Sequence, residues 1–410
     1  MTVTERFLRY VQIDTQSKPD MDVVPSTRKQ HDLAKLLAEE LQAMGAQVTY
    51  DTDHCYVYAS IPATIQTSAS PLGLIAHMDT SDAVSGKDVK PRIVSAYPGG
   101  DIVLNEAEHI ALSPSVFPEL SEYIGQDVIV TDGTTLLGAD DKAGVAEIMA
   151  LAERLLADPS IPHGEIRIAF TPDEEVGNGV AAFDNDVFGA PVAYTVDGGK
   201  VGEIGYETFN AASLTLTVHG VSTHPGSAKG KMQNALLLGM EFESMLPTFE
   251  KPEYTEQREG FYHLTDMQGD VDTAVLHYIL RDHDAEKLEE KKQCVRRICG
   301  YLNEKYGEGS FEATISDAYR NMREVIEHHF YLVKQAEEAM KECGVEPFES
   351  VVRGGTDGSV LSFRGIPCPN LSTGGHNCHG RYEFITVQSL QKMTDILERI
   401  VTRHAQSAQK

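Results

Sequence analysis

Residues Ile166–Gly177 read I-R-I-A-F-T-P-D-E-E-V-G, an alternating apolar run that ends in a cluster of acids. The apolar positions alternate with period two, which predicts a strand with one buried face. Glu174 and Glu175 follow almost directly, and acids at the end of a buried strand are costly unless a positive group compensates them. An isolated Glu-Glu pair is more often a solvated turn, so this pair does not define a site alone.

Four further segments carry acids or histidines, and three of them stand at predicted strand ends or helix starts. These segments are His77-Met78-Asp79, Asp140-Asp141, Asp197-Gly198-Gly199 and Gly375-His376-Asn377-Cys378-His379-Gly380. Each one is a weak signal by itself. Together with the Glu-Glu pair they make five segments of imidazole and carboxylate groups, which indicates one metal site.

The composition limits the classes of partner. The chain has 410 residues, enough for two domains with a sizeable core. It carries 62 acidic and 35 basic residues, a formal net charge of −27. Nucleic acids and anionic membranes attract basic surfaces, so we expect neither as a partner.

Sequence patterns also predict where in the cell the protein is located. The N-terminal segment contains the charged residues Arg6, Arg9 and Asp14, and it lacks the apolar core of a secretory signal. No run approaches the roughly 20 apolar residues of a membrane-spanning helix. The six cysteines show no C-x-x-C spacing. These features predict a reducing, cytoplasmic environment.

Predicted strands alternate with predicted helices over the first 200 residues. This alternation predicts an α/β sheet, mostly parallel, with functional groups at the carboxyl ends of its strands. The Asp132-Gly133 turn also predicts a short hairpin. The predicted helices are Arg28–Met44 and Lys142–Ala157, the strands are Pro71–Ala76, Ile166–Phe170 and Val192–Val196, and the hairpin joins Val128–Thr131 to Thr135–Leu137.

The pattern changes near residue 209. Residues Ser213–Val218 alternate strictly between polar and apolar, as in an antiparallel strand with one wet face. Helices at Gln233–Met245 and Ala285–Leu302 and a strand at Val275–Arg281 complete an α+β insert. Helices at Val325–Glu342 and Thr386–His404 then restore the α/β pattern. We predict a discontinuous catalytic domain, 1–208 and 320–410, interrupted by an α+β lid, 209–319.

The residue types indicate how a metal would be held. His77 and Asp79 are two apart, so on a strand they share a side, and an acid beside a histidine ligand orients its ring. Asp140 and Asp141 open a helix, where one Asp is an ordinary cap, but two neighbouring carboxylates repel unless a cation is near. A carboxylate can also bridge two metal ions roughly 3.5–4 Å apart.

The remaining candidates leave two assignments open. Of Glu174 and Glu175, one can bind metal while the other acts as general base on water. Either His379 or His376 can be the last ligand, because spacing does not separate them. Imidazole and carboxylate without thiolate suit zinc, with cobalt or manganese as substitutes. The H-E-x-x-H, G-x-S-x-G and phosphate-loop signatures are absent.

In this order, the motifs resemble those of the di-zinc exopeptidases, a family that includes carboxypeptidase G, aminoacylase and the dinuclear dipeptidases. Within it the resemblance is greatest to the tripeptide aminopeptidases. It implies a catalytic domain with a mostly parallel central sheet flanked by helices, and an inserted lid or dimerisation domain. The segments that carry it include Leu136–Gly144, Phe170–Gly177, Tyr194–Gly199, Phe209–Ser213, Gly260–Leu264, Asn321–Glu324 and Arg353–Gly358.

The resemblance implies a ligand set for two zinc ions per subunit. Asp140 would bridge the two ions. His77 and Asp197 would complete the first site. Glu175 and His379 would complete the second. It also implies a cis peptide between Asp140 and Asp141.

The resemblance implies roles for five further residues. Asp79 would orient His77, and Glu174 would be the general base. His224 on the insert would stabilise the oxyanion. Arg281 and Arg353 would anchor a substrate carboxylate or carbonyl. The two weakest correspondences are those of Arg281 and of the His224-Pro225-Gly226 segment.

The implied activity is hydrolysis of the N-terminal peptide bond of tripeptides. A related di-zinc amidohydrolase is the first alternative: a dipeptidase, a carboxypeptidase or an N-acyl amino acid deacylase. A non-catalytic peptide-binding protein is the second, and the presence of Glu174 disfavours it because binding needs no base. The insert at 209–319 is also a candidate dimerisation surface, which would make the protein a homodimer.

Overall fold

The buried apolar runs form the middle of an eight-stranded mixed sheet in the computed structural model, which describes residues 1–407. Strand β3 (Leu72–His77) lies between β8 (Ile166–Thr171) and β9 (Val192–Val196), and both neighbours run parallel to it. Every residue of β3 and β9 is buried, as in a sheet covered on both faces. The predicted α/β class is therefore confirmed.

The outer part of this sheet is antiparallel, so the whole is more mixed than predicted. The strand order is β1-β2-β8-β3-β9-β16-β10-β15. The β1–β2, β2–β8 and β16–β10 pairs are antiparallel, and β9–β16 is parallel. The outer strands are β1 (Gln47–Asp51), β2 (Tyr56–Ile61), β16 (Asn370–Leu371), β10 (Glu203–Glu207) and β15 (Phe348–Val351).

Helices of this unit begin and end near their predicted bounds. Helix α2 (Gln30–Met44) ends at Gly45, whose φ of 102° is the left-handed conformation that glycine adopts easily at a helix end. Helix α3 (Ala139–Ala157) packs on β3. Helix α10 (Val387–Ser407) starts after Thr386, whose hydroxyl accepts the Ser389 N–H at 3.0 Å. The unit also contains α1 (Val3–Tyr10), α4 (Asn185–Phe188), α7 (Arg323–Ile326), α8 (Tyr331–Glu342) and α9 (Asp357–Phe363).

Two local predictions are wrong. The helix expected at Val325–Glu342 is broken into α7, a 3-10 turn at Glu327–His329, and α8. The hairpin around Asp132-Gly133 does not form, because β7 (Val128–Val130) pairs with other strands. Its partners are β4 (Arg92–Val94) and β17 (Phe384–Thr386), which are distant in sequence. A separate two-stranded sheet contains β5 (Ile102–Asn105) and β6 (Ile110–Leu112).

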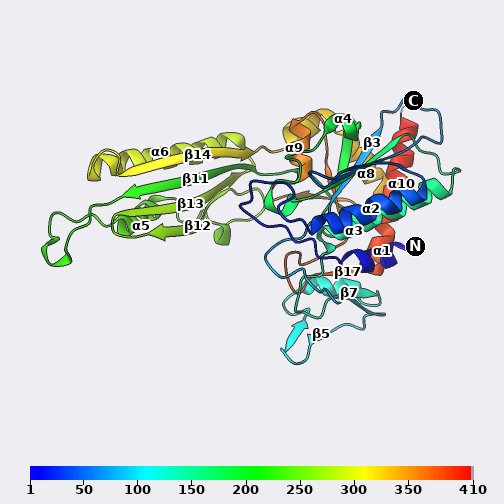
Figure 1. The fold of residues 1–410 in the computed structure, drawn as a ribbon, viewed down its shortest axis with the longest axis horizontal. Coiled ribbons are helices and arrows are strands. Elements are labelled where there is room, and N and C mark those ends of the chain that lie inside the picture. The colour runs from blue at the N-terminus through cyan, green and yellow to red at the C-terminus, as the bar shows by residue number, and fades with distance from the viewer. Residues whose placement is uncertain (408–410) are drawn as a thin grey trace. The chain divides into compact units, whose positions relative to one another are not determined.

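The second unit is an α+β layer, visible in Figure 1 as the sheet β12-β13-β11-β14 with helices α5 and α6. The β11–β13, β11–β14 and β12–β13 pairs are antiparallel. One face of the sheet packs with both helices in a shared apolar core. The elements are β11 (Asn210–His219), β12 (Phe261–Gly269), β13 (Thr273–Asp282), β14 (Phe311–Tyr319), α5 (Ala235–Met245) and α6 (Ala285–Tyr306).

The chain passes between the two units more than once. The second unit contains Glu207–Arg323 and the short segment Val351–Gly355, and the first contains the rest. No helix within residues 1–407 is long and apolar enough to cross a membrane. All six cysteines are free.

Candidate active site and metal centre

The parallel strands bring the predicted site segments to one edge of the sheet. In the register of β3 and β8, His77 pairs with Thr171, and in that of β3 and β9, Ile75 pairs with Thr195. The three strands therefore end side by side. The residues just beyond these ends are Asp79, Glu174 and Asp197, which are far apart in sequence.

His77 presents its two ring nitrogens to different carboxylates. Nε2 lies 3.0 Å from Asp140 Oδ1 and 3.9 Å from Asp197 Oδ1. Nδ1 lies 3.3 Å from Asp79 Oδ1. Burial disfavours the charged ring, but Asp140 and Asp79 raise the pKa of His77 well above its ordinary value. Asp79 holds Nδ1, so Nε2 is the ring nitrogen that faces Asp140 and Asp197, and it would bind a metal ion after losing its proton.

Asp140 lies between two imidazoles. Its second oxygen, Oδ2, is 3.0 Å from His379 Nε2, and the same nitrogen is 2.9 Å from Glu175 Oε2. Burial opposes ionisation of Asp140, but hydrogen bonds from His379 and His77 hold its pKa below the ordinary range. Asp140 and Glu175 in turn raise the pKa of His379 to about 11.

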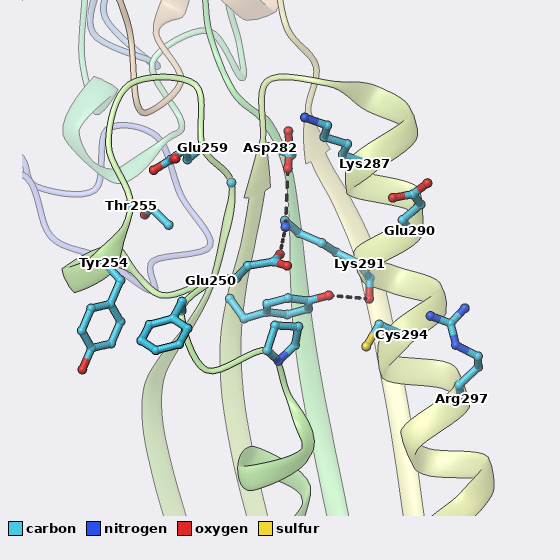
Figure 2. A pocket seen from close by; sticks show the side chains of 14 residues that line it. Glu250, Tyr254, Thr255, Glu259, Asp282, Lys287, Glu290, Lys291, Cys294 and Arg297 are labelled. Atoms are coloured by element: carbon cyan, nitrogen blue, oxygen red, sulfur yellow. Dashed lines mark hydrogen bonds and ion pairs between the residues drawn. The ribbon is translucent and has the colours of Figure 1, made fainter.

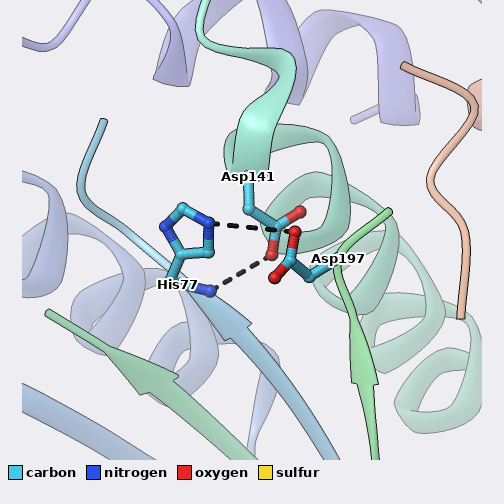
Figure 3. A group of neighbouring side chains, drawn as sticks. All are labelled: His77, Asp141 and Asp197. Carbon is cyan, nitrogen blue, oxygen red and sulfur yellow. Dashed lines mark hydrogen bonds and ion pairs between the residues drawn. The ribbon is translucent and has the colours of Figure 1, made fainter. Parts of the chain in front are cut away.

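Within residues 1–407, two groups that share His77 could hold a metal ion. Figure 3 shows His77, Asp141 and Asp197, and the second group is His77, Asp140 and Glu175; within each group the ligand atoms lie within 4.8 Å of one another. The Asp141 oxygens accept the backbone N–H groups of His77 and Gly144, both at 3.1 Å. Both Asp141 oxygens therefore accept backbone N–H groups. Asp140 is the better candidate to bridge two metal ions.

Glu174 and Glu175 begin a 3-10 turn, and their side chains have different surroundings. Glu175 Oε2 faces His379, whereas the buried Glu175 Oε1 has no hydrogen-bond partner within the described chain. The Glu174 side chain makes no hydrogen bond that the structure records. Burial raises the pKa of Glu174 well above its ordinary value.

These donors fit zinc. They are imidazole nitrogens and carboxylate oxygens without thiolate, the set that hydrolytic zinc sites use. A buried carboxylate oxygen without a partner, such as Glu175 Oε1, is expensive unless a cation or donor meets it. Burial also raises the pKa of Asp197 to about 8, and the nearby Asp140 adds to this effect. A bound cation would relieve this crowding of negative charge.

The two C-terminal histidines are clearly separated. His379 reaches Asp140 and Glu175, as described above. His376 Nε2 lies 2.6 Å from the Tyr123 hydroxyl, and its ring stacks on Phe384. Sequence spacing left open whether His376 or His379 is the last ligand, and these contacts favour His379.

The three predicted residues on the second unit have quite different environments. His224 is exposed, and its Nδ1 accepts the Gly226 N–H at 3.1 Å. Arg353 donates to the carbonyl oxygens of Gln257 and Glu259 at 2.7 and 3.1 Å. Arg281 lies over the Tyr319 ring at 4.6 Å, and its buried Nη1 has no hydrogen-bond partner among residues 1–407. Their predicted roles remain predictions.

Two buried carboxyl groups near these segments were not expected. Asp357 accepts the Thr171 hydroxyl at 2.7 Å, and burial raises its pKa to about 7. Glu383 accepts backbone N–H groups of the turn that carries Asp140. In the sequence Asp357 resembles an ordinary helix-start acid, and Glu383 is a single acid beside a short strand. The four-residue spacing from His379 to Glu383 was the one sequence feature that could have pointed to Glu383.

A separate pocket lies in the second unit. It encloses about 610 Å³ and is lined by residues of the 247–262 segment and α6. Its buried cation, Lys291, is already paired with Glu250 and Asp282, as Figure 2 shows. None of the candidate metal ligands lines it. These ion pairs indicate that the charged residues of this pocket have a structural role.

Comparisons with known proteins identify the family. Peptidase T of Alkaliphilus oremlandii is 51% identical over 401 residues, covering 97% of this chain and 98% of the relative. An aminopeptidase PepT structure from Bacillus cereus has a TM-score of 0.77 at 25% identity, and a tripeptidase structure from Staphylococcus aureus has 0.78 at 23%; both alignments cover 98% of each chain. The profile of the family described as Peptidase family M20/M25/M40 matches residues 131–403. The chain is a member of peptidase family M20/M25/M40.

Proposed function

We propose that this chain is a zinc-dependent aminopeptidase that releases the N-terminal residue of tripeptides. The observation that carries this proposal is the position of Asp140 between His77 and His379, with the half-buried Glu174 in the neighbouring turn. The 51% identity to a peptidase T supports the substrate class. The likeness to structures described as an aminopeptidase and a tripeptidase supports it further.

Five residues would hold the two zinc ions. Asp140 would contact both, His77 and Asp197 would hold one, and Glu175 and His379 would hold the other. When bound, zinc supplies Lewis acidity that polarises an amide carbonyl and makes hydroxide available from water near neutral pH.

The chain itself moves the proton. Glu174 accepts a proton from the attacking water and passes it to the leaving amine. Burial raises the pKa of Glu174 well above its ordinary value, which favours uptake of that proton. Asp79 orients His77 through Nδ1 and binds the backbone of the Glu174–Glu175 turn.

Residues of the second unit would complete the site. His224 would donate to the oxyanion that forms at the scissile carbonyl, which requires closure of the 209–319 lid. Arg281 and Arg353 would anchor the substrate carboxylate or carbonyl. The homodimer, the lid boundaries at 209 and 319, and the cytoplasmic location belong to this proposal as well.

A substrate panel tests the proposal directly. Di-, tri- and tetrapeptides with free amines, N-acetyl tripeptides and N-acyl amino acids are assayed with and without a chelator. Cleavage confined to free-amine tripeptides, lost with chelator and restored by zinc, is the expected result. Cleavage of N-acyl amino acids or dipeptides would favour the related amidohydrolases. Tight peptide binding without any cleavage would favour a peptide-binding protein.

A further inference from the structure

Glu383 is a buried carboxylate that contacts the turn before helix α3. It is 1% exposed. Its Oε2 accepts the backbone N–H groups of Leu137 and Gly138, both at 2.7 Å. Its Oε1 accepts the N–H of Asp140 at 3.0 Å. One side chain thus accepts three backbone N–H groups of the segment Leu137–Asp140, which carries the candidate bridging ligand.

The turn needs such an acceptor. Gly138 has φ of 82° and ψ of 29°, a left-handed conformation. Backbone N–H groups at the start of a helix have no partner within the helix, so the side chain supplies what the turn lacks. An anion that accepts several backbone donors holds their positions relative to one another. Glu383 therefore holds the backbone at Asp140.

Glu383 also belongs to the loop that carries His379. The base of this loop is closed by paired backbone hydrogen bonds, from His376 N–H to Phe384 O at 2.9 Å and from Phe384 N–H to His376 O at 3.1 Å. Glu383 is adjacent to this closure, and its own N–H donates to Gly380 O at 3.3 Å. His379 has a φ of 62°, a left-handed value that a residue other than glycine adopts rarely.

We infer that Glu383 is a positioning residue of the metal centre: it joins the Asp140 turn to the His379 loop and sets the spacing of these two ligands. The inference rests on the proposed metal-dependent function. Residues that act through a metal ligand typically change metal affinity or activity by about 10–100-fold when they are replaced.

Glu383→Gln is the first test, because it preserves shape. One of its two acceptor oxygens becomes an amide NH₂, which cannot accept an N–H. Zinc binding to metal-free protein is measured by competition with a chromogenic chelator. We expect affinity to fall about 10–100-fold, and kcat to fall while KM changes by less than about threefold.

Asn303→Ala is the matched control. The Asn303 side chain also holds a backbone segment, since it accepts the Phe311 N–H at 2.8 Å and donates to Phe311 O at 3.0 Å, but it lies in the second unit. This variant is expected to melt earlier and to bind zinc like the wild type.

The outcomes separate the inference from the proposed function. Wild-type zinc affinity in Glu383→Gln, with only a lower melting temperature, would overturn the inference. If that variant does not fold, Glu383→Asp replaces it. Aspartate is one methylene shorter and cannot keep all three bonds, so unchanged zinc affinity there would also overturn the inference. A wild-type protein without zinc binding or chelator-sensitive activity would instead refute the proposed function.

Discussion

The Asp79 carboxylate accepts the backbone N–H of Glu174 at 3.0 Å through Oδ1 and that of Glu175 at 3.2 Å through Oδ2. The same Oδ1 lies 3.3 Å from His77 Nδ1. One buried side chain therefore connects the end of β3 to the turn beyond β8. This links the orientation of a candidate ligand to the position of the candidate base.

Asp79→Asn should reduce both zinc affinity and kcat by about 10–100-fold, because an amide cannot accept both N–H groups and also orient the ring. Asp184→Asn is a suitable control, since the Asp184 side chain also accepts two N–H groups, those of Asp186 and Val187. Titration with zinc and steady-state kinetics measure the effects. Equal behaviour of the two variants would show that Asp79 has no special role.

Glu174→Gln should keep both zinc ions and lose about 10²–10⁴-fold in kcat, the contribution expected of a positioned general base. Glu175→Gln should instead lose zinc, because Glu175 Oε2 faces His379. Elemental analysis beside kinetics distinguishes the two. Loss of zinc from Glu174→Gln, with retention by Glu175→Gln, would reverse the assignment.

His379→Ala should bind about one zinc ion per chain instead of two, because it removes a ligand of one site. His376→Ala should keep both, since His376 bonds with Tyr123. Metal analysis after dialysis against a weak chelator measures the stoichiometry. A normal zinc content in His379→Ala would contradict the assignment.

His224→Ala should lower kcat by about 10²–10³-fold, the usual cost of one oxyanion donor, without a change in zinc content. His219→Ala removes another exposed histidine of the second unit and should have little effect. Kinetics with a saturating tripeptide measures the difference. Full activity in His224→Ala would exclude His224 from the reaction.

His376 should make the metal-free protein less stable in acid. Burial lowers its pKa from 6.5 to about 4. Between these values the unfolded chain binds more protons than the folded chain, so this stability is present above pH 6.5 and is lost as pH falls toward 4. Urea unfolding of wild type and His376→Gln at pH 7, 6 and 5 measures it. The wild type should lose more stability than the variant, and parallel curves would contradict the assignment.

Local sequence patterns predicted much of the fold, because the spacing of apolar residues and the composition of a segment reflect directly which side chains are buried. The strands β3, β8 and β9 and the helices α2, α3 and α10 lie close to their predicted bounds. The predicted hairpin between Val128–Thr131 and Thr135–Leu137 was wrong because strand pairing depends on partners that are distant in sequence. Phe384–Thr386 is such a partner, and no local signal identifies it.

The sequence by itself determined which chemical groups are available. Imidazoles and carboxylates stand at the ends of predicted strands, where so many acids would be costly to bury in a core. The sequence contains no nucleophile motif and no phosphate motif. Only the tertiary structure decided which of these groups meet. It distinguished His379 from His376 and Asp140 from Asp141, and it placed Glu383 against the Asp140 turn. The reason is physical: residue type sets which bonds a side chain can form, whereas distances between segments more than 200 residues apart exist only after the sheet has assembled.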